Sequence, residues 1–416
     1  MEQVFKGEIQ MKTTTIRTVF VAVGMAIFSA YAVDTTIKID SVEQRWPWNN
    51  KVDITYTITG GQDVSQSKFC KVEFKTVIGD VSYTIDGSTL GASATTGRHV
   101  VTWTAPSGIK SDNCTMSATI STTDVPSGDD YMIVDLVSGK ITYEGLFATQ
   151  QESDARYNTD VGGANVYKES KLVLRKIPAG GPYCILDSTT LTTDRNYYIG
   201  IYPVTRRQYE LVGADVSSDA AENEVEGNII PHRPCVRISW IGLRTDIAST
   251  TSIPLVDSDN TGTFFQRLRY MTGNVLAFDL PTDLMFNLAA RAGATTKYFY
   301  GDNVDQSKMV CSDNSGGKRT AVGSKSANAW GLFDVSGNVW ERALDTYAGS
   351  NSLSKRADIF TPVYNPSETR HKWIGGGDYS TPSTSSFFQL DRCAGDLATA
   401  DSGQFNVGFR VSVIMD

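Results

Sequence analysis

The chain has 416 residues, of which 40% are hydrophobic and 20% are charged, and its formal net charge is −8. This length leaves room for two or three domains with sizeable hydrophobic cores. An acidic chain without a basic cluster lacks the positive surface that binds phosphates, so we expect neither nucleic acid nor an anionic membrane as a partner.

A short apolar segment near the N-terminus predicts export. Lys12 and Arg17 precede an apolar run at residues 19–30, and residues 30–32 have the A-x-A pattern of a signal-peptidase site. The run is too short to span a bilayer. We therefore predict a signal peptide at residues 1–32, a mature chain without a transmembrane segment, and a secreted, periplasmic or cell-surface protein.

Residues 33–127 have the pattern of an all-β domain. Val52, Ile54, Tyr56 and Ile58 alternate with polar residues, which predicts a strand with one buried face. Similar short runs follow at regular intervals, separated by turns that contain Gly, Asp or Pro. This number and spacing of strands is typical of an immunoglobulin-like or fibronectin-like sandwich.

The chain then changes character twice. We interpret residues 128–170 as a linker with one possible strand at 131–137, because turn residues are frequent there. From 171 to 416 short strands alternate with long loops, so regular structure should be scarce. Two helix N-caps are predicted in this part, Thr205 before RRQYELVG and Thr282 before DLMFNLAARAG, in which Gly293 is the expected stop.

All six cysteines lie beyond the predicted signal peptide: Cys70, Cys114, Cys184, Cys235, Cys311 and Cys393. An even number of cysteines in an exported chain predicts disulfides. The first two fall in the same predicted domain and should pair, whereas the other four allow three connectivities. No C-x-x-C spacing occurs and the three histidines are scattered, so we expect no zinc site.

Eight motifs of the second half resemble, in their order, the formylglycine-generating enzyme (sulfatase-modifying factor) family. The resemblance spans about residues 171–416 and implies a compact, irregular α+β domain similar to the C-type lectin fold. The motifs are IPAG (177–180), YYIGIYPVTRRQY (197–209), PCVRISW (234–240), LPTDLMFNLAARAG (280–293), YFYGD (298–302), VGSKSANAWGLFDVSGNVWER (322–342), GGGDY (375–379) and NVGFR (406–410).

The resemblance also implies a chemistry whose expected metal ligands are missing from this chain. Family catalysts oxidise a sulfatase cysteine to formylglycine with copper and oxygen, and two cysteines after a GGSY-like motif hold the metal. Thr381 and Ser386 stand at these two positions. Because Cu(I) is soft and prefers thiolates to hydroxyls, we expect no copper and assign no catalytic residue.

A calcium site is implied by the same resemblance. The family ligands correspond to the side chains of Asp334 and Glu341 and the carbonyl oxygens of Gly337 and Val339. Carboxylates combined with backbone oxygens suit Ca²⁺. We therefore expect a structural calcium ion, against the alternative that the two acids are solvated or paired with arginine.

A polar and aromatic segment that begins at the end of the GGGDY motif is the candidate ligand-binding region. The resemblance adds that some proteins of this fold are ligand-binding receptors whose sequences vary near the same place. Such a composition suits adaptable recognition, although an ordinary exposed loop would look the same. The candidate residues are Asp378, Tyr379, Ser380, Thr381, Ser386, Phe387 and Arg392.

Together these features predict a calcium-stabilised, non-catalytic binding module for a glycan, a peptide or a surface protein. The alternative is a divergent formylglycine-generating oxidase, in which case the partner would be a sulfatase. A structural component of the cell envelope is a third interpretation. The missing copper cysteines favour the binding module over the oxidase.

Overall fold

The computed structural model describes the chain in segments separated by gaps. The predicted signal peptide, Cys114 and the side chain of Cys70 lie outside the described part. The described residues are 36–45, 50–59, 68–78, 81–86, 90, 97–106, 115–124, 126–159, 165–186, 189–213, 231–245, 253–255, 262–347, 356, 358–364, 372–390, 392–395 and 403–415.

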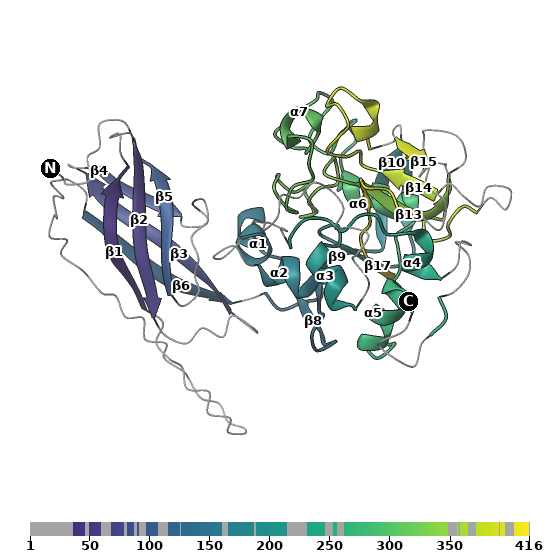
Figure 1. Ribbon diagram of the computed structural model, residues 1–416, viewed down its shortest axis with the longest axis horizontal. Coiled ribbons are helices and arrows are strands. Elements are labelled where there is room, and N and C mark those ends of the chain that lie inside the picture. Colours follow the sequence, from purple (N-terminus) through teal and green to yellow (C-terminus); the bar gives the residue numbers. More distant parts are fainter. Residues whose placement is uncertain are drawn as a thin grey trace, which may run out of the picture. The chain divides into compact units, whose positions relative to one another are not determined.

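Two compact units make up the chain, and strands outnumber helices in the described residues (Figure 1). The first unit comprises Met1–Pro126 and Gln151–Asn165, and the second comprises Ser127–Gln150 and Val166–Asp416. No helix of the described residues is long and apolar enough to cross a bilayer.

The first unit contains two antiparallel sheets of three strands each. Their orders are β1-β2-β5 and β4-β3-β6. The strands are β1 (Thr36–Gln44), β2 (Lys51–Thr59), β3 (Lys68–Ile78), β4 (Val81–Asp86), β5 (Gly97–Thr104) and β6 (Thr115–Asp124), and a helix, α1 (Gln150–Tyr157), follows later in the chain.

Both sheets bury their apolar faces in one shared cluster. The alternation predicted for β2 is confirmed, because Val52, Ile54, Tyr56 and Ile58 are all buried. Tyr56 meets Phe74 of the other sheet edge to face, with ring centroids 5.3 Å apart. The period of two in the sequence therefore decides which face of each sheet forms the core.

The second unit is built on an antiparallel sheet of five strands in the order β17-β12-β9-β7-β8. The segment that the sequence suggested as a linker supplies β7 and β8, and β7 pairs with β9 along its whole length. The strands are β7 (Tyr131–Asp135), β8 (Ile141–Glu144), β9 (Lys171–Ile177), β12 (Tyr197–Gly200) and β17 (Ser412–Ile414).

A smaller sheet of four strands has the order β15-β14-β13-β16, and a separate hairpin joins β10 to β11. Strand β13 is buried along its whole length and pairs in parallel with β16. The strands are β10 (Gly180–Leu186), β11 (Thr189–Thr193), β13 (Trp340–Thr346), β14 (Lys372–Gly375), β15 (Cys393–Gly395) and β16 (Val407–Gly408).

The helices of this unit are short, and their caps follow the sequence. Thr205 and Thr282 are confirmed as N-caps, since each side chain accepts a hydrogen bond from the backbone three residues on. The helices are α2 (Val166–Glu169), α3 (Arg206–Leu211), α4 (Trp240–Arg244), α5 (Phe264–Met271), α6 (Asp283–Arg291), α7 (Ser312–Ser315) and the 3₁₀ helix η4 (Ser386–Phe388).

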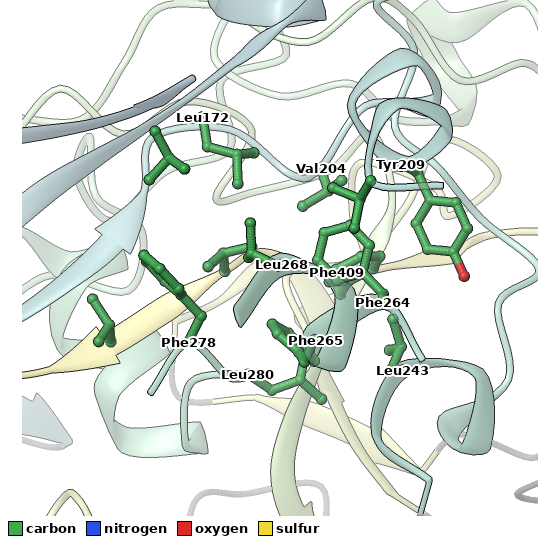
Figure 2. Packing of buried hydrophobic residues seen from close by; sticks show 14 of the residues in the cluster. Leu172, Val204, Tyr209, Leu243, Phe264, Phe265, Leu268, Phe278, Leu280 and Phe409 are labelled. Atoms are coloured by element: carbon green, nitrogen blue, oxygen red, sulfur yellow. The ribbon is translucent and has the colours of Figure 1, made fainter. Parts of the chain in front are cut away.

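An aromatic cluster forms the largest core of the second unit (Figure 2). Phe264 of α5 stacks on Tyr209 of α3 at 5.2 Å and meets Phe409 edge to face at 5.0 Å. These contacts join two helices to the segment between β16 and β17. Aromatic anchors of this kind replace the thick layered core that the loop-rich sequence lacks.

Disulfides do not support this unit. Four cysteine side chains are described, all of them buried, and no two are joined in a disulfide: Cys184, Cys235, Cys311 and Cys393. The last three lie in three different hydrophobic clusters, so their sulfur atoms do not meet. The disulfides predicted among these four are therefore absent, whereas the expected Cys70–Cys114 pair lies outside the described side chains.

The aromatic cluster makes Phe264 a sensitive position. We expect Phe264→Ala to lower the free energy of unfolding by about 3–5 kcal/mol, because it removes a fully buried ring and leaves a cavity. Val275→Ala is the control, since Val275 is 69% exposed and its loss should cost less than about 0.5 kcal/mol. Urea unfolding measures both, and equally small losses would contradict this packing.

Candidate functional site

A buried ion pair organises the segment at residues 322–342, here called the Trp loop. Arg410 donates from Nε and Nη2 to both carboxylate oxygens of Glu341, at 2.5 and 2.6 Å. Its Nη1 and Nη2 also donate to the carbonyl oxygens of Gly200 and Phe333, each at 2.9 Å. One fully buried guanidinium therefore joins the end of β12, the Trp loop, β13 and the C-terminal segment.

A second buried side chain, Asn328, holds the start of the same loop. Its Nδ2 donates to the carbonyl oxygens of Ala289 and Ala290 near the end of α6, at 2.8 and 3.0 Å. Its Oδ1 accepts from the backbone of Trp330 and Leu332, each at 3.0 Å. The amide thus satisfies helix carbonyls that have no partner within α6.

The Trp loop turns where the backbone is left-handed. Gly337 has φ +90°, and a Cβ there would stand 2.2 Å from the carbonyl oxygen of Val310, so only glycine fits. Asp334 and Asn338 also have positive φ, at 54° and 68°. Trp340 is buried and meets the ring of Phe387 edge to face at 5.2 Å.

Among the residues expected to bind calcium, one of the two acids pairs with an arginine. Both carboxylate oxygens of Glu341 are bound by Arg410, which leaves Asp334 as the remaining carboxylate. Calcium takes six to eight oxygen ligands. No group of three or more His, Cys, Asp or Glu side chains in the described residues is placed to share a metal. The calcium ion therefore stays a prediction of the sequence.

Asp334 is a buried acid in an unfavourable setting. Burial raises its pKa to about 6, and the charge of Glu341 adds to this effect. A hydrogen bond from the backbone of Gly323, at 2.8 Å, and the positive charges of Arg410 and Lys168 act in the opposite direction. The carboxylate thus depends on nearby positive charge to stay ionised.

The two positions of the family copper ligands carry hydroxyl groups in the structure. The hydroxyl of Thr381 donates to Asp378 Oδ1. Ser386 begins η4 and is exposed. Cys393, the nearest cysteine along the chain, is buried in the hydrophobic cluster around α6. A pair of thiolates is therefore absent from these positions, as the sequence requires.

The other candidate ligand-binding residues fall into two groups, buried residues that hold the backbone and residues that reach the surface. Asp378 is buried, and its Oδ2 accepts from Ser380 at 2.8 Å and from Asn406 at 2.7 Å. Tyr379 is also buried, and its backbone N–H donates to Asn338. At the surface, Ser380 and Ser386 are exposed, and the following are half-buried: Thr381, Phe387 and Arg392.

Sequence reasoning missed two contributors to this region. Asp313 holds the candidate ligand-binding segment at Ser383. Its Oδ2 accepts hydrogen bonds from the hydroxyl and the backbone of Ser383, and these bonds lower the pKa of Asp313. Phe405 is 47% exposed and precedes Asn406, the partner of Asp378. A signal was present for Phe405, because an aromatic residue directly precedes the NVGFR motif.

A second acidic cluster lies at the start of α6. The Nη2 of Arg356 is 2.6 Å from Asp283 Oδ1 and 3.1 Å from Asp345 Oδ1. Asp345 also accepts from the backbone of Asp283, at 2.7 Å, and of Val363, at 2.6 Å. Burial and the charge of Asp283 raise the pKa of Asp345 to about 7.

Comparison with known protein families identifies the family of this chain. A family model described as the Sulfatase-modifying factor enzyme 1-like domain matches residues 168–414. The chain therefore belongs to the sulfatase-modifying factor family, as the order of its motifs indicated. No curated protein matches the chain.

Three solved structures are similar to this chain. Treponema denticola variable protein 1 has a TM-score of 0.45 and 18% identity over 58% of this chain and 95% of that one. PvdO from Pseudomonas aeruginosa has a TM-score of 0.41 and 19% identity over 59% and 95%. CarF has a TM-score of 0.38 and 18% identity over 59% and 99%.

The buried ion pair predicts a large effect of one substitution. Glu341→Ala leaves the guanidinium of Arg410 buried without its partner, so we expect a loss of about 3–5 kcal/mol in the free energy of unfolding. Arg207→Gln is the control, because it removes an exposed pair with Glu210 and should cost less than about 1 kcal/mol. Similar losses for both variants in urea unfolding would refute this role.

The acidic cluster predicts how stability depends on pH. Because the folded pKa of Asp345 lies above its unfolded value, its contribution is full below about pH 4 and is lost as pH rises through about 7. Asp283→Asn removes the neighbouring charge and should flatten this part of the Tm profile, while the exposed Asp194→Asn should not. Parallel profiles for all three proteins between pH 4 and 8 would rule the pair out as its source.

Proposed function

We propose that this protein is an exported recognition module whose sulfatase-modifying-factor-like domain binds a ligand and does not oxidise cysteine. The observation that carries the proposal is the pair of hydroxyl groups at the copper positions. Thr381 uses its hydroxyl to support Asp378, and Ser386 offers no thiolate for Cu(I). The family scaffold is thus retained without the ligands of its metal chemistry.

Three neighbouring segments supply the proposed binding surface. The ring of Phe387 packs on Trp340, whose backbone N–H donates to Asn406 at 2.9 Å. Asn406 in turn donates to Asp378, so residues 378–381, 386–387 and 404–406 are tied together. The buried Asp378 acts as their support, and the exposed side chains around it are free to differ without cost to the core.

The ligand we propose is a glycan, a peptide or a surface protein. Phe405 and Phe387 offer aromatic surface, and the exposed Ser386 offers a hydroxyl group next to Phe387 in the chain. Aromatic faces combined with small polar side chains are typical of surfaces that bind such ligands.

The remaining features of the proposal concern export and the first unit. The two antiparallel sheets of the first unit share one core, which supports our proposal that this unit is an immunoglobulin-like or fibronectin-like sandwich. The basic residues, apolar run and A-x-A pattern of the N-terminus support export. We propose that the sandwich is a carrier or spacer for the binding domain outside the cytoplasm.

A glycan array and a panel of purified surface proteins test the function. For any ligand that binds the full mature chain, Phe405→Ala combined with Phe387→Ala should weaken binding by roughly 10-fold or more, because aromatic anchors dominate such interfaces. Val275→Ala, at an exposed site elsewhere in the same unit, should bind as the wild type does.

A parallel assay addresses the oxidase alternative. The reduced chain is incubated with Cu(I), oxygen and a cysteine-containing sulfatase peptide, and conversion of the peptide cysteine is followed by mass spectrometry. We expect no conversion. Copper-dependent turnover of the peptide would overturn the proposal even if the glycan array or the protein panel identified a ligand.

A further inference from the structure

The proposed binding surface lies in two stretches of the chain that lack charged residues. Residues 379–390 and 403–409 contain no Asp, Glu, Lys or Arg, although 20% of the whole chain is charged. At their borders, Asp378 is buried, Arg392 is half-buried, and Asp313 is hydrogen-bonded to the first stretch. A charged ligand would find little exposed charge to bind here, so the surface favours a neutral one.

The first stretch presents small side chains to the surface and keeps every second residue inside. The hydroxyls on the inner side are used by the protein itself, since Thr381 donates to Asp378 and Ser383 donates to Asp313. These contacts hold the backbone and leave the outer side chains uncommitted to the fold. The exposed residues are Ser380, Pro382, Thr384 and Ser386.

Several polar groups of the two stretches have no partner among the described residues. No hydrogen bond within this part of the chain uses the hydroxyls of Thr384 and Ser386 or the side-chain amide of Gln404. The Oδ1 of Asn406 is buried and has no hydrogen-bond partner either. Phe405, between these two amides, is 47% exposed. The surface therefore combines an exposed ring with donors and acceptors that only solvent or a ligand can satisfy.

This combination does not suit the common ways of binding a peptide or a protein. The first stretch consists of turns and η4, so it offers no strand edge for an added strand, and it has no arginine cluster for an acidic motif. Serine is depleted in protein–protein interfaces, and serine and threonine are rare among the residues that dominate their binding energy. A surface protein is thus a poorer match than a ligand that is itself rich in hydroxyl groups.

A neutral sugar has the complementary chemistry. Each of its hydroxyl groups both donates and accepts hydrogen bonds, as the hydroxyls of Thr384 and Ser386 and the amide of Gln404 require. The apolar C–H faces of its rings can pack on exposed aromatic side chains such as Phe405.

We infer that the ligand of this surface is a neutral glycan, and that Thr384, Ser386 and Gln404 exchange hydrogen bonds with it beside the ring of Phe405. The inference rests on the proposed recognition function and narrows its ligand to one chemical class. It also extends the surface to Thr384 and Gln404, which the sequence did not single out.

An array of immobilised oligosaccharides tests the ligand class with the full mature chain. It compares neutral glucose, mannose and galactose oligomers with sulfated and sialylated ones, at about 0.05 M and about 0.5 M NaCl. We expect binding to neutral oligomers that changes by less than about twofold between the two salt concentrations, because salt screens only charged contacts.

A matched pair of variants tests the residues. Thr384→Val keeps the shape of the side chain and removes its hydroxyl, so binding to the neutral oligomer that the wild type retains should weaken roughly 3–10-fold. Thr142→Val, at an exposed position of β8, is the control and should bind as the wild type does. Both variants should unfold at the Tm of the wild type, since both side chains are exposed.

The outcomes separate this inference from the function on which it rests. Binding that is restricted to acidic glycans and lost at high salt overturns the neutral ligand and leaves the recognition function in place. Binding to a purified surface protein and to no glycan does the same. Equal affinities of Thr384→Val and Thr142→Val overturn the assignment of the residues. If no glycan binds, the inference fails, and the protein panel alone then decides the proposed function.

Discussion

The second unit depends on one buried ion pair, between Arg410 and Glu341. An isolated guanidinium could not be buried at acceptable free energy, so the pair forms only when the end of β12, the Trp loop and β13 are all in place. The same requirement positions Trp340, which directly precedes Glu341, and Phe409, which directly precedes Arg410. The aromatic core and the irregular loops are thereby tied to one electrostatic contact.

The proposed binding surface follows from that arrangement. The carboxylate of Asp378 accepts hydrogen bonds from Ser380, Thr381 and Asn406. The backbone N–H of the next residue, Tyr379, donates to the Trp loop. Support thus comes from Asp378 and the side chains that it binds, whereas Ser386 and Phe405 present exposed side chains. A surface built in this way can change its outer residues while the buried ones keep the backbone in place.

Local features could be predicted from the sequence because they depend on neighbouring residues. The caps at Thr205 and Thr282 and the alternation in β2 belong to this class. The motif order identified the family for the same reason, since each motif is a short local pattern. The hydroxyl groups at Thr381 and Ser386 could likewise be recognised directly.

Long-range pairing could not be predicted in this way. Pairing with an arginine was the stated alternative for Glu341, but nothing in the neighbouring residues indicates that the partner is Arg410, 69 residues away. The cysteines misled because an even count says nothing about where each thiol packs, and three of them fill separate hydrophobic clusters.

The position of β16 and β17 has a consequence for how the protein is made. Both strands come from the last residues of the family domain, yet β17 pairs with β12 and β16 with β13. The five-stranded and the four-stranded sheet of the second unit can therefore be completed only when the final stretch of this domain has been synthesised. A chain that ended before these strands would leave one edge of β12 and one edge of β13 without a partner, and such open edges are exposed to proteases and to pairing with other chains.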